Sequence, residues 1–219
     1  MSDYLENIFS LKNKTALITG GSKGIGAGIV SAFINAGANV VSLSRSKPIL
    51  EEQDSLSYYQ CDISDLVEFE RICKLVDCQY GGIDILVNAA GISLSSESFD
   101  NKFERFNKTL LINLVATYQC CEVASKFMHH NSSIINITSI GSMLGFPENP
   151  GYVASQGGVM ALTKSLAMDL SLKNIRVNNI VPGYIKTDMT RKSFKDDLLH
   201  KERLDRMIIK RWVEVDDFT

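Results

Sequence analysis

Short apolar runs alternate with longer amphipathic stretches along most of this 219-residue chain. Six of the runs are bounded by glycine, proline or polar residues and predict β-strands at 15–19, 39–43, 58–60, 83–88, 133–138 and 175–181. Strands that alternate with helices predict an α/β fold, a doubly wound parallel sheet with helices on both faces. Because no repeat or linker interrupts the pattern, we expect residues 1–219 to form one domain.

Residues that favour helix ends mark the boundaries of the predicted helices. Asp65 and Glu68 have the spacing of a capping box, and Gly37 and Gly81 are placed to end helices. We predict helices at about 25–36, 65–80, 103–129 and 152–172. The charged segment 187–211 is expected to form helical excursions over the end of the sheet.

Composition and charge limit the possible partners. Apolar residues make up 45% of the chain and charged residues 22%, with a formal net charge of -2, as in ordinary soluble domains. The basic residues form no patch, so we expect neither nucleic acid nor a membrane surface as a partner. The polar lead-in, 1–14, lacks the apolar core of a signal peptide, and the five cysteines lack metal-ligand spacing. These features predict a cytoplasmic protein without a bound metal ion.

A glycine-rich segment, Gly20-Gly-Ser-Lys-Gly-Ile-Gly26, joins the first predicted strand to its helix. In such a turn the backbone amides come close enough to bind a pyrophosphate at the helix N-terminus. The alternative is a tight turn without a ligand, but the strand–loop–helix context favours a dinucleotide site. The residues predicted to bind the cofactor here are Gly20, Ser22, Lys23, Gly24, Ile25 and Gly26.

The end of the second predicted strand bears on which dinucleotide is bound. A site that prefers NAD places a carboxylate about twenty residues past the glycines, where it binds the ribose 2′-hydroxyl. This chain has Ser44, Arg45 and Ser46 there. Arg45 and Lys23 are suited to a 2′-phosphate, to which the two serines can also donate. The sequence therefore predicts NADP(H) in preference to NAD(H).

A serine ends the fifth predicted strand, and a tyrosine begins the helix that follows. Ser139 precedes Tyr152 by thirteen residues, and Gln156 lies one helical turn after the tyrosine. Together with other segments, this arrangement resembles the short-chain dehydrogenase/reductase family. The matching segments follow in order along nearly the whole chain: Thr19-Gly-x-x-x-Gly-Ile-Gly26, Cys61-Asp62-Ile63, Asn88-Ala-Ala-Gly91, Asn113, and Pro182-Gly183 with Thr187.

The resemblance implies a Rossmann-like fold and roles for particular residues. Tyr152 would act as general acid/base, Ser139 would hydrogen-bond the substrate oxygen, and Asn113 would fix a water that relays the proton. Further cofactor contacts are implied for the adenine (Asp62, Ile63), the ribose (Asn88, Ala89, Ala90, Gly91) and the nicotinamide end (Pro182, Gly183, Ile185, Thr187). Taken singly, Asp62 also has the character of a helix cap and Thr187 that of an exposed loop residue.

Gln156 departs from the family pattern, which has a lysine at this position that holds the ribose and lowers the pKa of the tyrosine. A free tyrosine titrates near ~10, so activity near neutrality needs a shift of roughly three units, about 4 kcal/mol. A glutamine can hydrogen-bond the ribose but carries no charge to provide that shift. We therefore expect cofactor binding to persist, oxidation to suffer most, and ketone reduction to be weak.

Several other polar residues are assigned local or surface positions. Ser142 and Ser155 are secondary candidates for the site, and the interpretation favoured for both is a cap of nearby backbone groups. The three histidines, His129, His130 and His200, belong to no motif, and we expect them on the surface.

The segment 182–190, the residues near Arg211-Trp212 and the opening 8–14 resemble the sugar-acid and polyol branch of the family, such as gluconate 5-dehydrogenases and 2-deoxygluconate 3-dehydrogenases. Four basic residues of that region would then either meet a substrate carboxylate or form a solvated face: Lys186, Arg191, Lys192 and Lys195. Reductases of 3-oxoacyl chains on carrier protein share the same motifs. A third possibility is an NADP-binding protein or subunit without turnover.

The family continues past the point where this chain ends. Another helix and a strand, roughly 25–30 residues by ordinary element lengths, are expected after Asp217. Without them, the sixth strand is expected at an exposed edge, which favours association. A homodimer or homotetramer is the expected state where this end is complete.

Overall fold

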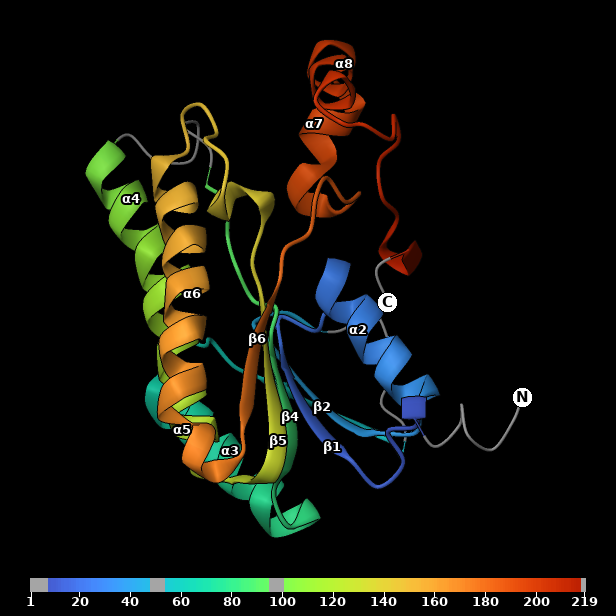
Figure 1. The fold of residues 1–219 in the computed structure, drawn as a ribbon, viewed down its shortest axis with the longest axis vertical. Helices are drawn as coiled ribbons and strands as arrows, with labels where there is room; N and C mark the ends of the chain where they lie inside the picture. The colour runs from blue at the N-terminus through green and yellow to red at the C-terminus, as the bar shows by residue number, and fades with distance from the viewer. Residues whose placement is uncertain (1–7, 48–53, 95–100, 218–219) are drawn as a thin grey trace.

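Six parallel strands form the centre of the molecule, in the order β3-β2-β1-β4-β5-β6 (Figure 1). The computed structural model describes residues 8–47, 54–94 and 101–217, so residues 1–7 of the predicted lead-in lie outside it. The strands are β1 (Thr15–Thr19), β2 (Asn39–Ser44), β3 (Leu56–Gln60), β4 (Ile83–Asn88), β5 (Met128–Ile137) and β6 (Arg176–Ile180). This strand order is that of a doubly wound sheet, which confirms the predicted fold class.

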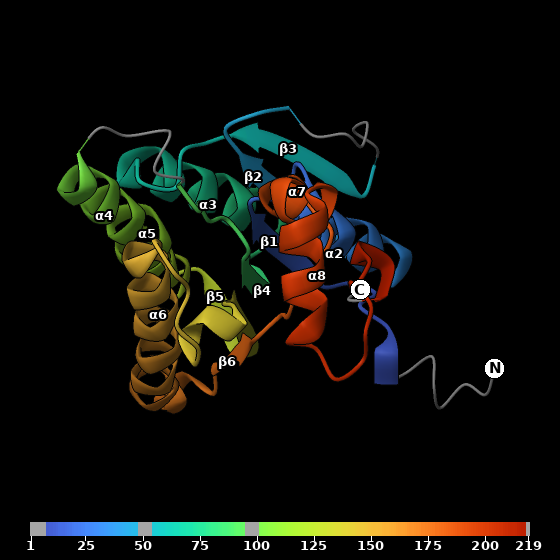
Figure 2. The same ribbon diagram turned by 90° about the horizontal axis from the view of Figure 1, so that it is seen from above.

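Helices cover both faces of the sheet (Figures 1 and 2). On one face lies α2 (Gly24–Asn35), packed over a core that includes Ile18, Val30 and Val40. The other face carries α3 (Leu66–Tyr80), α4 (Lys102–Leu110), α5 (Ala116–Ala124) and α6 (Pro150–Asp169). Within the described ranges, no helix is both long and apolar enough to cross a membrane.

Capping residues define the ends of α3 largely as predicted. Asp65 accepts a hydrogen bond from the Glu68 N–H at the start of this helix. The Glu68 carboxylate pairs with Arg71 instead of returning to Asp65, so only half of the predicted capping box forms. At the other end, Gly81 adopts a left-handed conformation with φ 78°, which favours glycine.

The predicted helix at 103–129 is wrong at its end. Helix α5 ends at Ala124, and Met128 already belongs to β5, where it pairs with Ile83. The register then shifts, since Ile85 pairs with Ser133. The start of β5 has no alternation of apolar and polar residues that would indicate a strand. The predicted helix was therefore extended past the residue at which α5 ends.

A π-helical turn, η2 (Leu111–Val115), interrupts the helical region between α4 and α5. The wider turn contains Asn113, which is buried. Such turns often occur at functional sites. The helical pattern of the sequence continues through this segment and did not reveal the turn.

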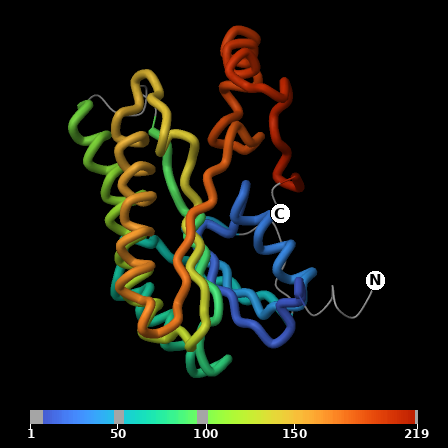
Figure 3. Tube along the Cα trace, in the orientation of Figure 1, coloured from blue at the N-terminus to red at the C-terminus, as the bar shows by residue number. Residues whose placement is uncertain are grey.

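After β6 the chain forms a lid segment, residues 187–211, and then returns toward α2 (Figures 1 and 3). The lid contains η5 (Asp188–Thr190), α7 (Arg191–Lys195) and α8 (Asp197–Asp205). Its two ends are joined, because Ile185 pairs with Val213 and the Lys186 N–H donates to the Val213 carbonyl. The predicted helical excursions are therefore confirmed.

An aromatic cluster packs beneath the lid segment. Trp212 is buried, and its ring contacts those of Tyr184 and Phe194, with centroid distances of 5.6 and 5.7 Å. His200 stacks on the same indole at 6.0 Å and is half-buried, so its predicted surface position is wrong. His129 and His130 are exposed, as predicted.

Strand β6 lies at one edge of the sheet that the described residues form, as expected. Ile180 at its end is 40% exposed. The expectation of a further helix and strand stays a prediction.

Candidate active site

A cavity of about 510 Å³ lies at the carboxyl ends of β1, β2, β3 and β4. In open α/β sheets, ligands bind where the strand order reverses, which here is between β1 and β4. Fifteen of the predicted cofactor residues line this cavity: Gly20, Ser22, Lys23, Gly24, Ile25, Gly26, Ser44, Arg45, Ser46, Asp62, Ile63, Ala89, Ala90, Gly91 and Thr187. Six lining residues were not predicted: Leu43, Cys61, Ile92, Ile112, Asp188 and Met189.

The glycine-rich loop is pressed against the end of β4. A Cβ atom on Gly20 would lie 2.7 Å from the Ala90 backbone, and φ at Gly20 is 72°. A Cβ atom on Gly26 would lie 2.2 Å from the Gly20 carbonyl oxygen. Only glycine fits at either position. The loop therefore exposes backbone instead of side chains beside the first turn of α2, which suits a pyrophosphate.

Both basic residues that were predicted to bind a 2′-phosphate lie at this cavity. Arg45 follows β2 and Lys23 precedes α2, and both line the cavity. The Ser44 hydroxyl is buried and donates to the Ser46 carbonyl at 2.6 Å. The Ser46 hydroxyl lies 3.3 Å from that of Ser22 at the cavity wall. The Ser44 hydroxyl is therefore engaged with a backbone carbonyl, while the Ser46 hydroxyl faces a second hydroxyl at the cavity wall.

Asp62 contributes a carboxylate to the cavity. Burial raises its pKa, but hydrogen bonds from the Ser64 N–H and hydroxyl, and the nearby charge of Arg45, outweigh this and leave the pKa below its ordinary value. Asp62 is therefore ionised at neutral pH. The N-cap of α3 is Asp65, so Asp62 does not have the capping role that its sequence position also allowed.

Asn88, predicted beside the ribose, does not line the cavity. It is buried, and its Nδ2 donates to the Asn136 Oδ1 at 2.9 Å and lies 3.2 Å from the Cys121 Sγ. Pro182, Gly183 and Ile185 also lie outside the cavity lining. The Pro182 carbonyl accepts a hydrogen bond from the Ile140 N–H, which joins the end of β6 to the residue after Ser139.

The structure brings Ser139 and Tyr152 together. Ser139 lies two residues past the end of β5, and its hydroxyl accepts a bond from the Gly141 N–H at 3.1 Å. Tyr152 lies in the first turn of α6, whose start at Pro150 suits the fixed φ of proline. Burial raises the pKa of Tyr152, and a hydrogen bond with the Ser139 hydroxyl lowers it by less, so the pKa lies above its ordinary value.

Gln156 is buried one turn after Tyr152. Its Oε1 has no hydrogen-bond partner among the described residues. A buried amide oxygen without a partner is unfavourable by about 1–3 kcal/mol, and a ligand hydroxyl would relieve it. The ribose hydroxyls of a nicotinamide cofactor are suitable donors, so this residue fits the group that the resemblance implies.

The Asn113 side chain holds the segment that follows β4. Its Oδ1 accepts from the Ile92 N–H at 2.8 Å, and its Nδ2 donates to the Ile92 carbonyl at 2.9 Å and to the Ser155 hydroxyl at 3.1 Å. Both amide protons are therefore in use. Ser155 in turn donates to the Tyr152 carbonyl, and Ser142 to the Ser139 carbonyl, as predicted for local caps.

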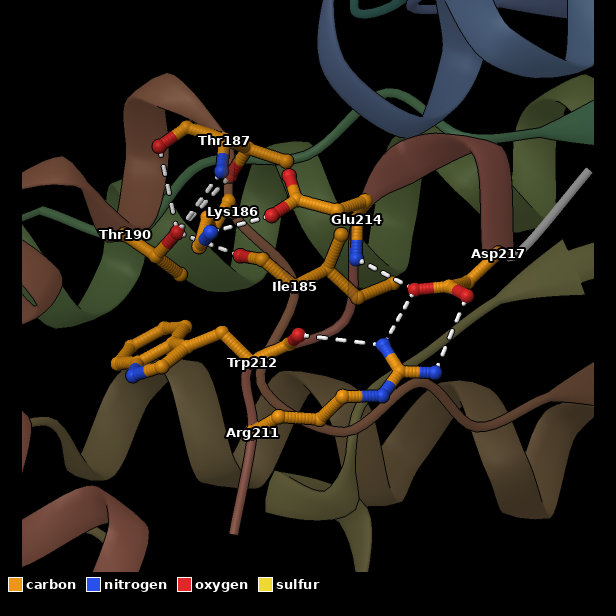
Figure 4. A network of polar contacts seen from close by, with 8 residues as sticks. All are labelled: Ile185, Lys186, Thr187, Thr190, Arg211, Trp212, Glu214 and Asp217. Carbon is orange, nitrogen blue, oxygen red and sulfur yellow. Dashed lines mark hydrogen bonds and ion pairs between the residues drawn. The ribbon is translucent and has the colours of Figure 1, made fainter. Parts of the chain in front are cut away.

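Ion pairs hold Lys186 and Arg191, which were predicted near the substrate. Lys186 pairs with Glu214, close to the pair between Arg211 and Asp217 (Figure 4). Arg191 pairs with Asp188. Lys192 and Lys195 are exposed. Thr187 forms a small capping box with Thr190, which orders the start of the lid beside Gly24.

Comparison with known proteins identifies the family. Residues 14–198 match the family model described as short chain dehydrogenase. A 3alpha-hydroxysteroid dehydrogenase of Mediterraneibacter gnavus is 38% identical over 82% of this chain and 76% of its own length. A 2-dehydro-3-deoxy-D-gluconate 5-dehydrogenase of Bacillus subtilis is 35% identical over 98% of this chain and 87% of its own. Among solved structures, a gluconate 5-dehydrogenase of Burkholderia cenocepacia in complex with NADP and tartrate aligns with a TM-score of 0.84 and 26% identity, over 97% of this chain and 87% of that one.

Proposed function

The chain belongs to the short-chain dehydrogenase family and is an oxidoreductase; from this we propose that it uses NADP(H) to reduce a ketone on a small polar substrate, preferably a sugar acid or polyol. The observation that carries the proposal is the buried, unpartnered Oε1 of Gln156, one helical turn after Tyr152, whose pKa the nearby Ser139 hydroxyl lowers in part. The proposed acid, Tyr152, therefore lies near both the hydroxyl of Ser139, which would bind the substrate, and the free amide oxygen of Gln156.

The cavity residues would hold the cofactor. Gly20, Gly24 and Gly26 would leave room for the pyrophosphate, and Arg45 and Lys23 would bind the 2′-phosphate. Gln156, which lies outside the cavity lining, would accept a hydrogen bond from the nicotinamide ribose. When bound, the nicotinamide would supply the hydride.

The protein's own residues would handle the oxygen and the proton. Because the pKa of Tyr152 is raised, its phenol is protonated at neutral pH and can donate that proton to the oxygen of a forming alkoxide. The Ser139 hydroxyl would bind the same oxygen and orient the carbonyl. In the oxidative direction the phenolate is required, and burial without a neighbouring cation disfavours it. Reduction is therefore the favoured direction.

The substrate class rests on the relatives. Two of the three proteins compared above carry names of sugar-acid dehydrogenases, and the third is named for a hydroxysteroid. Reductases of 3-oxoacyl thioesters remain the alternative that the sequence motifs allow. The neutral Gln156 and the raised pKa of Tyr152 favour a second candidate function, an NADP-binding protein without turnover.

The decisive experiment measures binding and turnover separately. NADPH and NADH binding are followed by fluorescence, and NADPH consumption is then measured with keto-aldonates, diketones, a 3-ketosteroid and an acetoacetyl thioester. We expect NADPH to bind more tightly and a keto-aldonate to be reduced slowly. Tighter binding of NADH would overturn the cofactor assignment. Binding with no consumption of NADPH would overturn the reductase and support the protein without turnover.

A further inference from the structure

Three asparagines lie side by side across β4, β5 and β6. Asn88 pairs in register with Asn136, and Asn136 pairs with Asn179. We call these three residues the asparagine row. Residues paired in a parallel sheet point to the same face, and here that face packs against α5 and α6. Strands covered on both faces normally carry apolar side chains. A row of buried amide side chains between the sheet and the helices is therefore unusual and needs a physical reason.

The row is joined to α6 through one hydroxyl. The Asn88 Nδ2 donates to the Asn136 Oδ1 at 2.9 Å, and the Asn136 Nδ2 donates to the Thr163 Oγ1 at 2.8 Å. The Thr163 Oγ1 lies 2.8 Å from the Val159 carbonyl of its own helix and 3.0 Å from the Asn179 Oδ1, so these two acceptors share its one proton. The Asn179 Nδ2 donates to the Met160 carbonyl at 3.4 Å. Asn88, Asn136 and Thr163 are buried. Hydrogen bonds therefore join β4, β5 and α6, and Asn179 links β6 to α6 through Met160 and the shared Thr163 hydroxyl.

The same two elements carry the catalytic pair. Ser139 lies three residues after Asn136, just past the end of β5. Thr163 follows eleven residues after Tyr152 on α6, about three helical turns, so both side chains lie on nearly the same face of the helix. A slide or rotation of α6 along the sheet would break the bonds of Thr163 and also move the Tyr152 phenol relative to the Ser139 hydroxyl.

We propose that Thr163, held by Asn136 and Asn179, is a positioning residue that sets α6 in the register at which Tyr152 meets Ser139. Apolar contacts alone would press α6 onto the sheet without specifying its position along the axis, since dispersion and hydrophobic burial are not directional. Hydrogen bonds are directional and fail over a shift of about 1 Å. A displacement of this size at reacting groups can lower a rate by about 100-fold.

The test uses a nearly isosteric change. Thr163→Val removes the hydroxyl and keeps the volume, and Thr163→Ser keeps the hydroxyl. Thr109→Val is the matched control, because both hydroxyls are buried and bond a carbonyl of their own helix, whereas Thr109 has no bond to a strand among the described residues. We expect Thr163→Val to lower kcat for ketone reduction at least about tenfold. The Kd for NADPH should rise by less, because Gln156 lies on the same helix but the glycine-rich loop, Lys23 and Arg45 lie outside α6. Thr163→Ser and Thr109→Val should stay near the wild-type kcat.

A second readout does not need turnover, which matters because the kinetic test rests on the proposed reductase function. Ionisation of Tyr152 is followed by near-ultraviolet absorbance as the difference between each protein and its Tyr152→Phe version. Loss of the Ser139 contact in Thr163→Val should raise the pKa of Tyr152 further. If wild type reduces none of the ketones, the reductase proposal fails, while this titration still decides the positioning proposal.

A lower melting temperature for Thr163→Val with kcat and the Tyr152 titration unchanged would overturn the proposal and leave Thr163 a structural residue only. A decrease in kcat for Thr109→Val as large as that for Thr163→Val would also overturn the proposal. If Thr163→Val does not fold, Asn179→Ala replaces it. Asn179 is half-buried at the edge strand and is the less disruptive site, and its loss removes one of the two links to Thr163.

Discussion

A lysine at position 156 tests the central chemical argument about this site. Gln156→Lys would place a cation one helical turn from Tyr152, where Cβ atoms are about 5–6 Å apart. At about 6 Å and an effective dielectric constant of about 20, the attraction between an ammonium and a phenolate is about 3 kcal/mol. This equals about two pKa units. It acts against the burial that raises the pKa of Tyr152.

The expected effect of Gln156→Lys differs between alcohol oxidation and ketone reduction. Oxidation of an alcohol needs the phenolate, which accumulates only above the raised pKa, so the wild-type rate should climb through the alkaline range without a plateau. In Gln156→Lys this rise should move down by about two pH units, and oxidation near pH 8 should increase up to about 100-fold. Reduction needs the protonated phenol and should change much less. Initial rates against pH, in both directions, provide the measurement.

Ala154→Lys is the matched control for added charge. Ala154 is exposed on the first turns of α6, two residues from Tyr152 and therefore on a different face. We expect its pH profile to match that of wild type. A folded Gln156→Lys protein that binds NADPH normally but keeps the wild-type profile would refute the argument that a missing cation limits this enzyme.

Three further predictions concern the cavity and the thiols. Arg45→Asp should reverse the preference from NADPH to NADH, measured as the ratio of the two dissociation constants; an unchanged ratio would show that Arg45 does not bind the phosphate. Gly26→Ala should lower stability by about 1–3 kcal/mol and weaken NADPH binding, because its Cβ would lie 2.2 Å from the Gly20 carbonyl oxygen, whereas Gly145→Ala, with nothing within 4 Å, should do neither. A thiol reagent at pH 8 should label one cysteine quickly, the exposed Cys78, since the other four are buried; rapid labelling of two or more in native protein would contradict this.

Much of the candidate site followed from local sequence. The glycine-rich loop was predicted from the spacing of its glycines, which is the spacing needed where backbone segments approach closely. The structure shows this close approach at Gly20 and Gly26. The pairing of Ser139 with Tyr152 was also predicted, from the resemblance. Their neighbour Ser155 was correctly interpreted as a local cap, since bonds to backbone three residues away depend on helix geometry alone.

Side chains whose partners are distant in sequence were harder to predict. The sequence did not indicate that the Asn88 Nδ2 bonds Asn136 and the Cys121 Sγ in the core, while the expected contact of Asn88 with the ribose stays a prediction. His200 was expected on the surface because nothing near it in sequence indicates the indole of Trp212. The start of β5 and the π-helical turn at Leu111–Val115 were missed because their irregular backbone is stabilised by neighbouring strands and helices.

The sequence by itself determined the alternation of strands and helices, the cofactor loop, and the absence of a cation at position 156. These properties depend on side-chain periodicity and on residue identity, which are local. Only the tertiary structure decided that Lys186 and Arg191 are ion-paired, that the Gln156 Oε1 is buried without a partner in the described part of the chain, and that Thr163 joins three strands through the asparagine row. Hydrogen bonds, burial and pKa shifts arise from groups brought together by folding, and their strength depends on distances of a few ångströms between residues far apart along the chain.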